Sequence, residues 1–131
     1  MNHASEDVKD MLVAESALAL SLGTTLHLHR EPDTPDDCVT IYDTPSYPPD
    51  MMYSKEEVYY HSSIQVRVRS SDPDVGMALA RDIMDALHNR AQETWNATLY
   101  TVIQATGEPA TIAWDENNRV IIVINFNLQR R

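Results

Sequence analysis

The chain has 131 residues, of which 43% are hydrophobic, which suits one domain (residues 1–131) with a buried core. Ten Lys and Arg against twenty Asp and Glu give a formal net charge of −10, the wrong sign for a protein that grips phosphates. The first ten residues are polar and acidic, and no apolar run is long enough to cross a bilayer. We therefore expect a cytosolic origin and no membrane contact.

The first part of the chain predicts a helix followed by two strands. Ser5 is the expected N-cap, apolar residues recur at near-helical spacing as far as Leu22, and Gly23 is the expected stop. Residues 24–30 and 38–43 alternate as short strands on either side of a Pro- and Asp-rich connection, which predicts a hairpin. The second of these strands begins with Cys38. As a lone cysteine it excludes an intramolecular disulfide and a cysteine zinc cluster, and we expect it to be buried.

Residues 44–57 form a proline-rich segment. They hold three of the seven prolines, which rules out a central strand or a helix interior. The segment also carries four large, mainly apolar side chains, Tyr47, Met51, Met52 and Tyr53. Loops of this length are often functional, and the apolar residues favour an assembly segment that orders on a neighbouring protein. The alternative is that these side chains fold back on their own core.

The middle of the chain predicts a strand joined directly to a helix. From Val58 to Val68, apolar residues alternate with polar ones, which is typical of a strand with one buried face. Asp72 is a suitable N-cap and Pro73 a suitable first helical residue for a helix reaching Asn89. The strand and the helix must therefore share a core.

The last third of the chain predicts three strands. Residues 98–105 form the first, and TIAW and RVIIVINFNL flank a turn at residues 115–118. The last strand has apolar residues on both faces in its middle, so we expect it to be central. The predicted order is α-β-β-β-α-β-β-β, an α+β fold with a mostly antiparallel sheet and two helices on one face. The side chains expected to form its core are Ile64, Val66, Val68, Leu79, Ile83, Leu87, Ile122, Ile124 and Phe126.

The sequence contains few groups arranged for catalysis. It has no Gly-rich phosphate loop, no G-x-S-x-G and no H-E-x-x-H, and its aspartates at residues 33–37 lack the EF-hand pattern. His27 and His29 have the spacing of two metal ligands on one strand face, and His61 is a candidate third. Solvated histidines are the alternative interpretation.

Two arginines form a candidate contact site. Arg67 and Arg69 share a strand face with Gln65, an arrangement suited to forked hydrogen bonds with carboxylates. Those carboxylates belong either to a neighbouring subunit or to the same sheet.

Taken in order, these pieces resemble the minor capsid and tail-completion proteins of long-tailed bacteriophages, among them the tail terminators. The resemblance covers nearly the whole chain and rests on the order and spacing of an amino-terminal helix and a series of short matches. These are Arg30, Pro32, Pro35 and Asp36, Ile41-Tyr42-Asp43, Gln65-Val66-Arg67-Val68-Arg69, Ile83, Leu87, Pro109, Asp115-Glu116-Asn117, Arg119 and Asn125-Phe126. The chain departs from the family pattern where Thr44-Pro45 and Asn118 stand in place of glycine.

The resemblance implies a virion structural protein without enzymatic activity or cofactor, assembled in the host cytoplasm. It implies a homo-oligomeric ring, commonly hexameric, at the head-proximal end of the tail. Such a ring stops tail tube polymerisation, contacts the tube protein and the head-tail connector or neck protein, and lets genomic DNA pass through its lumen. A head-side neck or connector protein is the alternative in the same class. A small metal- or ligand-binding α+β domain using His27, His29 and His61 is the alternative in another class.

Overall fold

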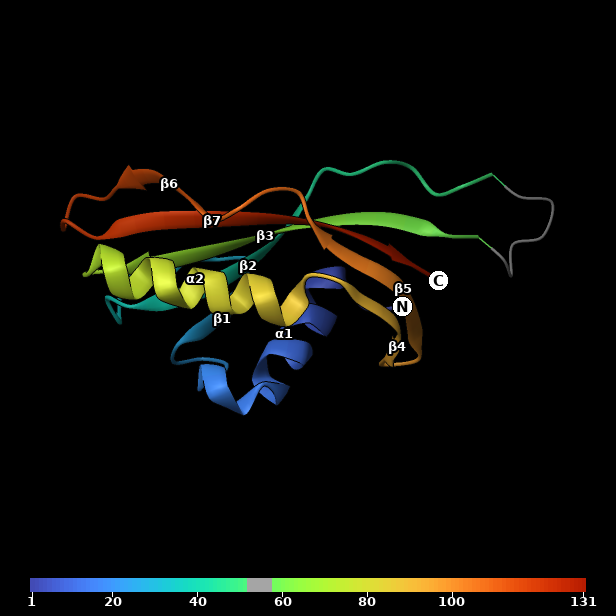
Figure 1. Cartoon of the computed structure of the whole chain (residues 1–131), viewed down its shortest axis with the longest axis horizontal. Helices are drawn as coiled ribbons and strands as arrows, with labels where there is room; N and C mark the ends of the chain where they lie inside the picture. Colours follow the sequence, from blue (N-terminus) through green and yellow to red (C-terminus); the bar gives the residue numbers. More distant parts are fainter. Residues whose placement is uncertain (52–57) are drawn as a thin grey trace.

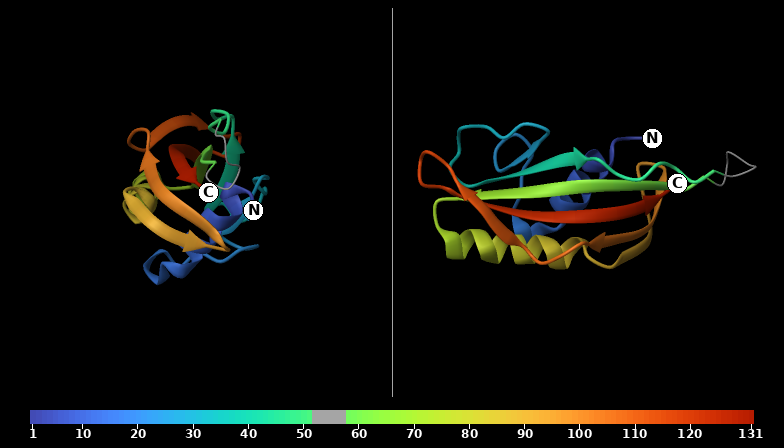
Figure 2. Two further views of the ribbon diagram at one scale, coloured as in Figure 1. Left: turned by 90° about the vertical axis from the view of Figure 1, so that its right-hand side faces the viewer. Right: turned by 90° about the horizontal axis from the view of Figure 1, so that it is seen from above.

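The computed structural model describes residues 1–51 and 58–131. A strongly curled sheet carries both helices on one face (Figure 1; Figure 2). The helices are α1 (Ala4–Ala14), α2 (Pro73–Leu87) and the short 3-10 helix η1 (Ser16–Leu18). The strands are β1 (Leu26–Leu28), β2 (Cys38–Thr44), β3 (Tyr60–Ser70), β4 (Arg90–Trp95), β5 (Thr98–Ala105), β6 (Ala110–Trp114) and β7 (Val120–Arg130). Within the described ranges no helix is long and apolar enough to cross a membrane.

The last strand, β7, is the centre of the sheet, as the sequence predicts. The strand order is β1-β2-β3-β7-β5-β4, and β6 also pairs with β7. Strand β7 pairs with β3 on one side. On its other side, Val120–Val123 pair with β6 and Phe126–Arg130 pair with β5. Among the named strands, pairing is antiparallel except between β1 and β2. The α+β class and the mostly antiparallel sheet are confirmed.

The unit formed by β3 and α2 is built as expected. The Asp72 side chain accepts a hydrogen bond from the Asp74 N–H at 2.9 Å, and Pro73 opens the helix. Gly76 allows the helix to lie close to the sheet, because a Cβ added there would stand 2.9 Å from Ser70 Cβ. The helix then covers β3 and β7 with its buried face.

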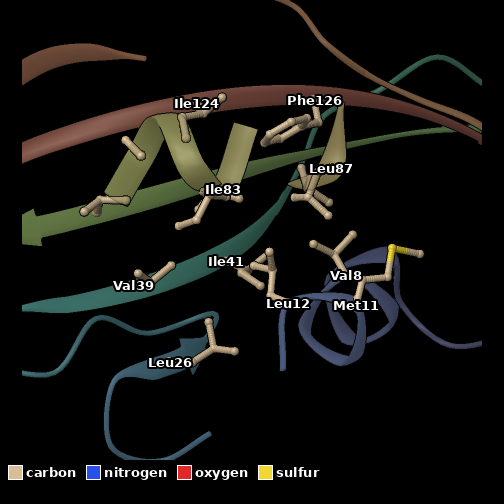
Figure 3. Close-up of a cluster of buried hydrophobic side chains, with 14 of the residues drawn as sticks. Val8, Met11, Leu12, Leu26, Val39, Ile41, Ile83, Leu87, Ile124 and Phe126 are labelled. Atoms are coloured by element: carbon tan, nitrogen blue, oxygen red, sulfur yellow. The ribbon is translucent and has the colours of Figure 1, made fainter. Parts of the chain in front are cut away.

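The core lies between the two helices and the sheet (Figure 3). Eight of the nine side chains expected there are buried, and Leu79 is partly buried against them. Helix α1 supplies a second half of this core through Val8, Met11 and Leu12, which meet Leu26 and Ile41. Cys38 is 3% exposed, as expected for a buried strand residue, and burial raises the pKa of its thiol.

A buried polar network joins α1 to the sheet at the end of the molecule where both termini lie (Figure 1). The Asp7 carboxylate is 0% exposed and accepts hydrogen bonds from the Tyr100 hydroxyl and, at 2.7 Å, from Asn96 Nδ2. Arg130 Nη1 lies 3.9 Å from the same carboxylate and donates to the Asn2 carbonyl at 2.7 Å. Burial and the bond to Asp7 raise the pKa of Tyr100, so this hydroxyl stays protonated.

The predicted hairpin of residues 24–30 and 38–43 is wrong. Strands β1 and β2 pair in parallel, with Leu26 opposite Val39 and Leu28 opposite Ile41. Parallel pairing requires the connection to run back along the sheet before the second strand begins. The connection does so because residues 31–37 are anchored on Arg69, at the end of β3, and on Arg119, just before the start of β7.

The predicted start and end of the first helix are also wrong. His3 is the N-cap, while the Ser5 hydroxyl lies inside the helix and donates to Asp43 Oδ2 at 2.7 Å. Helix α1 ends at Ala14, and Ala19 has a left-handed backbone with a φ of 53° after η1. The apolar residues beyond Ala14 belong to η1 and to the turn that leads into β1.

One strand, β4, is absent from the sequence-based prediction. Its residues, RAQETW, show no alternation of apolar and polar side chains, and Gln92 has a positive φ of 56° that interrupts the ladder. The strand is held by pairing with β5 and by Arg90, whose guanidinium donates to Glu93 and Glu15 at 2.9 and 2.8 Å.

Candidate assembly surface

The face of the sheet opposite the helices is polar and uncharged over much of its area. We call it the polar face. Its members alternate with core residues along three adjacent strands: His61, Ser63, Gln65 and Arg67 on β3, Asn125, Asn127 and Gln129 on β7, and Gln104 on β5. None of them is Asp or Glu, although the chain carries twenty acidic residues.

Cross-strand hydrogen bonds order the amides of this face. Ser63 Oγ donates to Asn127 Oδ1 at 2.8 Å, and Gln65 Nε2 donates to Asn125 Oδ1 at 3.1 Å. Each asparagine accepts through its oxygen, which leaves its N–H₂ group available as a donor. The polar face therefore presents side-chain donors to whatever covers it.

A groove of about 250 Å³ lies between the polar face and the proline-rich segment. Its lining includes Ser63 on β3, Asn127 and Gln129 on β7, Gln104 on β5 and, from the proline-rich segment, Tyr47. Residues 45–50 of that segment pass on the side of the sheet away from the helices (Figure 1). Sequence and structure thus bring a predicted contact segment and a polar sheet face together.

The predicted contact residues of the proline-rich segment are exposed where the structure describes them. Tyr47 is 77% and Met51 99% exposed, so neither folds back into its own core. Met52 and Tyr53 lie outside the described residues. The two exposed side chains are apolar surface that a partner would cover.

The structure separates the two candidate arginines. Arg69 is 3% exposed and donates to the carbonyls of Pro35 and Asp36 at 2.6 and 3.1 Å, so its partners are in its own chain. Arg67 lies on the polar face between Thr40 and Val123. In the described part of the chain, Arg67 Nε has no hydrogen-bond partner. Arg67 and Gln65 remain proposed contact residues.

Arg119 and Arg69 together hold residues 31–37 in place. Arg119 is 5% exposed and donates to the Asp33 carbonyl at 2.6 Å and to Asp115 Oδ2 at 2.6 Å. It also contacts Asp36 at 3.2 Å. The acidic residues of this loop are thereby fixed at one end of the sheet, and the sequence offered no signal that the two arginines would be buried.

Burial alone raises the pKa of the Asp115 carboxyl, but hydrogen bonds from Arg119 and from the Asn117 N–H outweigh it and hold that pKa below its ordinary value. An aspartate in an unfolded chain has a pKa of about 3.9. The ionised carboxylate therefore stabilises the fold above that pH, and the contribution fades as the pH falls through the lower, folded-state pKa.

We expect Asp115→Asn to lower the free energy of unfolding at about pH 6. Between about pH 5 and about pH 2, the stability of the variant should fall less steeply on acidification than that of the natural chain. Chemical denaturation at several pH values measures this. Asp82→Asn, at an exposed position on α2, is the matched control and should follow the natural chain. An Asp115→Asn variant whose stability fell on acidification as steeply as that of the natural chain would contradict the assignment.

The three histidines of the metal hypothesis have other neighbours. His27 Nε2 lies 3.0 Å from the Thr24 carbonyl, His29 Nδ1 lies 3.8 Å from Asp43 Oδ2, and His61 Nε2 lies 2.9 Å from Asp50 Oδ1. Residues 1–51 and 58–131 contain no group of three His, Cys, Asp or Glu arranged to hold a metal ion. The metal-binding alternative thus has no assembled ligand set in these residues.

Comparison with known proteins identifies the family. The sequence profile described as "Bacteriophage tail terminator protein" matches residues 13–131. The chain belongs to the bacteriophage tail terminator family. The chain is therefore a structural protein of the phage tail, and the resemblance to tail terminators inferred from the sequence is confirmed.

The fold of this tail terminator family member is also found in a solved virion. A chain in the structure titled "Virion of native gene transfer agent (GTA) particle" superposes with a TM-score of 0.67 at 15% identity, covering 98% of this chain and 94% of that one. At this identity the match shows a shared fold. No curated protein matches the sequence.

Proposed function

We propose that this chain forms a homo-oligomeric ring, a hexamer by the family's common pattern, at the head-proximal end of a phage tail. The ring stops polymerisation of the tail tube and joins the tail to the connector or neck of the head. Membership of the tail terminator family over residues 13–131 is the observation that carries this proposal. The protein assembles in the host cytoplasm and remains in the virion.

Two features of the structure support a role in assembly. The polar face and the exposed Tyr47 and Met51 offer a surface for protein contacts, and neither belongs to the core. The function is mechanical and involves no catalytic step or cofactor.

The net charge of −10 supports a role around DNA in transit. A negative wall repels the phosphates of a duplex, so genomic DNA slides through the lumen without binding to it. Specific DNA recognition is not part of the proposal.

Ring formation is tested by measuring the mass of the purified chain with size-exclusion chromatography and light scattering, alone and with purified tail tubes. We expect a mass of several subunits, six for a hexamer, which appears at high protein concentration or on tubes. A chain that stayed monomeric under both conditions would contradict the ring.

Arg67→Glu should weaken assembly and leave the subunit folded. The substitution places a carboxylate on a face that has none and removes a cation that can meet an acid of the neighbouring copy. We expect about a tenfold rise in the concentration at which half of the protein is assembled. The melting temperature of the dilute subunit should change little.

Arg81→Glu, on the exposed side of α2, makes the same change of charge and is the control for Arg67→Glu. It should assemble like the natural chain. Equal assembly of both variants at physiological salt would show that Arg67 is ordinary surface charge.

A further inference from the structure

We propose that in the ring the groove on the polar face binds residues 45–51 of a neighbouring copy, in place of the same residues of its own chain. This inference rests on the proposed function, because it requires several copies to assemble. It assigns the two surfaces that meet, the groove and residues 45–51.

The groove is weakly occupied by its own segment. Tyr47 lines it but keeps 77% of its surface exposed, and Met51 is 99% exposed. Among described residues, the hydrogen bonds of the segment are from the Asp50 N–H to the Tyr59 carbonyl at 3.1 Å and between His61 Nε2 and Asp50 Oδ1 at 2.9 Å. The contact is therefore loose enough to be exchanged.

Tethering explains why a neighbouring segment fits better than the chain's own. Residues 45–51 follow directly from β2, which pairs with β3 next to the groove, so Tyr47 is held close to its anchor at Thr44. The same segment of another copy is anchored on that copy's own β2, so it is not restrained by this chain's Thr44. It can lie along the groove and bury its tyrosine and methionine, which provides the apolar contribution to binding.

The hydrogen-bonding groups of the two surfaces are complementary. Pro45, Pro48 and Pro49 lack an N–H, so the segment offers mainly carbonyl acceptors. The lining of the groove includes the side-chain amides of Asn127, Gln104 and Gln129, whose N–H₂ groups can donate to such carbonyls. An extended proline-rich segment loses little conformational entropy when it binds.

The absence of carboxylates from the groove lining favours this surface for contact between copies. Two chains with a net charge of −10 repel each other unless their carboxylates stay apart. The groove contains none, and the one acid in residues 45–51, Asp50, has a histidine partner on the polar face. A contact between copies here brings no unpaired acids together.

The geometry of the contact agrees with a ring. The groove and the segment are different patches of one subunit, so each copy gives its segment to one neighbour and receives one from the other. Such head-to-tail contacts close into rings when the rotation between copies permits.

The decisive experiment uses two variants with one added cysteine each, Tyr47→Cys and Gln104→Cys, mixed in equal amounts and assembled before oxidation. A disulfide between them can form only between copies, and the native Cys38 is 3% exposed and does not take part. We expect a covalent dimer in the mixed rings at a level several-fold above rings of either variant alone. Assembled mixed rings without that dimer, or a cross-link to the tail tube protein instead, would overturn the inference.

An independent measurement replaces Asn127 with Asp, which adds a charge to the groove and preserves the side-chain shape. We expect about a tenfold higher concentration for half-assembly. Gln92→Glu, an amide-to-acid change on exposed β4, should leave assembly unchanged. Equal assembly of both variants would overturn the inference while the ring stands, whereas failure of the natural chain to form rings would remove the proposed function and this inference with it.

Discussion

Replacing Asp7 with alanine is expected to lower the free energy of unfolding by about 3–5 kcal/mol, the range for a buried charge network that loses one partner. The Asp7 carboxylate is fully buried and is the acceptor for Tyr100 and Asn96, with Arg130 beside it. Without it, the buried Tyr100 hydroxyl loses its acceptor and the Arg130 guanidinium loses the opposite charge 3.9 Å away, and no solvent replaces either.

The matched control for Asp7 is Asp10, on the same helix. It also bonds to Asn96, at 2.8 Å, but lies at the surface beside Lys9, which lowers its pKa by hydrogen bonding. Exposed pairs of this kind contribute about 0–1 kcal/mol, so Asp10→Ala should be mild. Chemical denaturation compares the two variants, and equal losses of stability would contradict the role of the Asp7 network.

Replacing Ile124 with alanine is expected to lower the free energy of unfolding by about 2–5 kcal/mol, because it leaves a cavity in the buried core. Ile124 is 1% exposed at the centre of β7, opposite Val66 on β3, and faces the helices beside Phe126 (Figure 3). The neighbouring strand β3 is paired on both sides, with β2 and β7, and has little freedom to collapse into the space.

Ile112→Ala, on the exposed strand β6, is the control for Ile124→Ala. Ile112 is 54% exposed, so its truncation removes little buried surface. Thermal or denaturant unfolding measures both variants. A melting temperature unchanged by Ile124→Ala would mean that β7 is not the centre of the sheet.

The parts of the fold that the sequence predicts are those whose signals are local. The alternation in β3, the Asp72 cap with Pro73 and the long apolar run of β7 depend on neighbouring residues, and the structure confirms each of them. Because β7 is apolar on both faces, its central position could be predicted as well.

The errors come from contacts that are distant in the sequence. The parallel pairing of β1 and β2 depends on Arg69 and Arg119, which lie more than thirty residues beyond the loop they anchor. No local pattern distinguishes such a buried arginine from an exposed one. Strand β4 has no apolar alternation, so it depends on its partner β5 for its conformation.

The candidate site could be predicted in part for the same reason. The prolines and exposed apolar residues of the segment mark it as a contact region, but the groove beside it needs Gln104 from β5 and Asn127 from β7 to meet at one place. That register, and the hydrogen bond from Ser63 to Asn127, follow from the folded sheet and have no signature along the chain.

The central claim, that this tail terminator family member stops tail tube growth, is tested most directly by electron microscopy of particles made without it. We predict tails of abnormal and variable length, and tails of normal length when the natural chain is supplied again. Finished tails of normal length that lie unattached to heads would contradict the account and identify a neck protein instead.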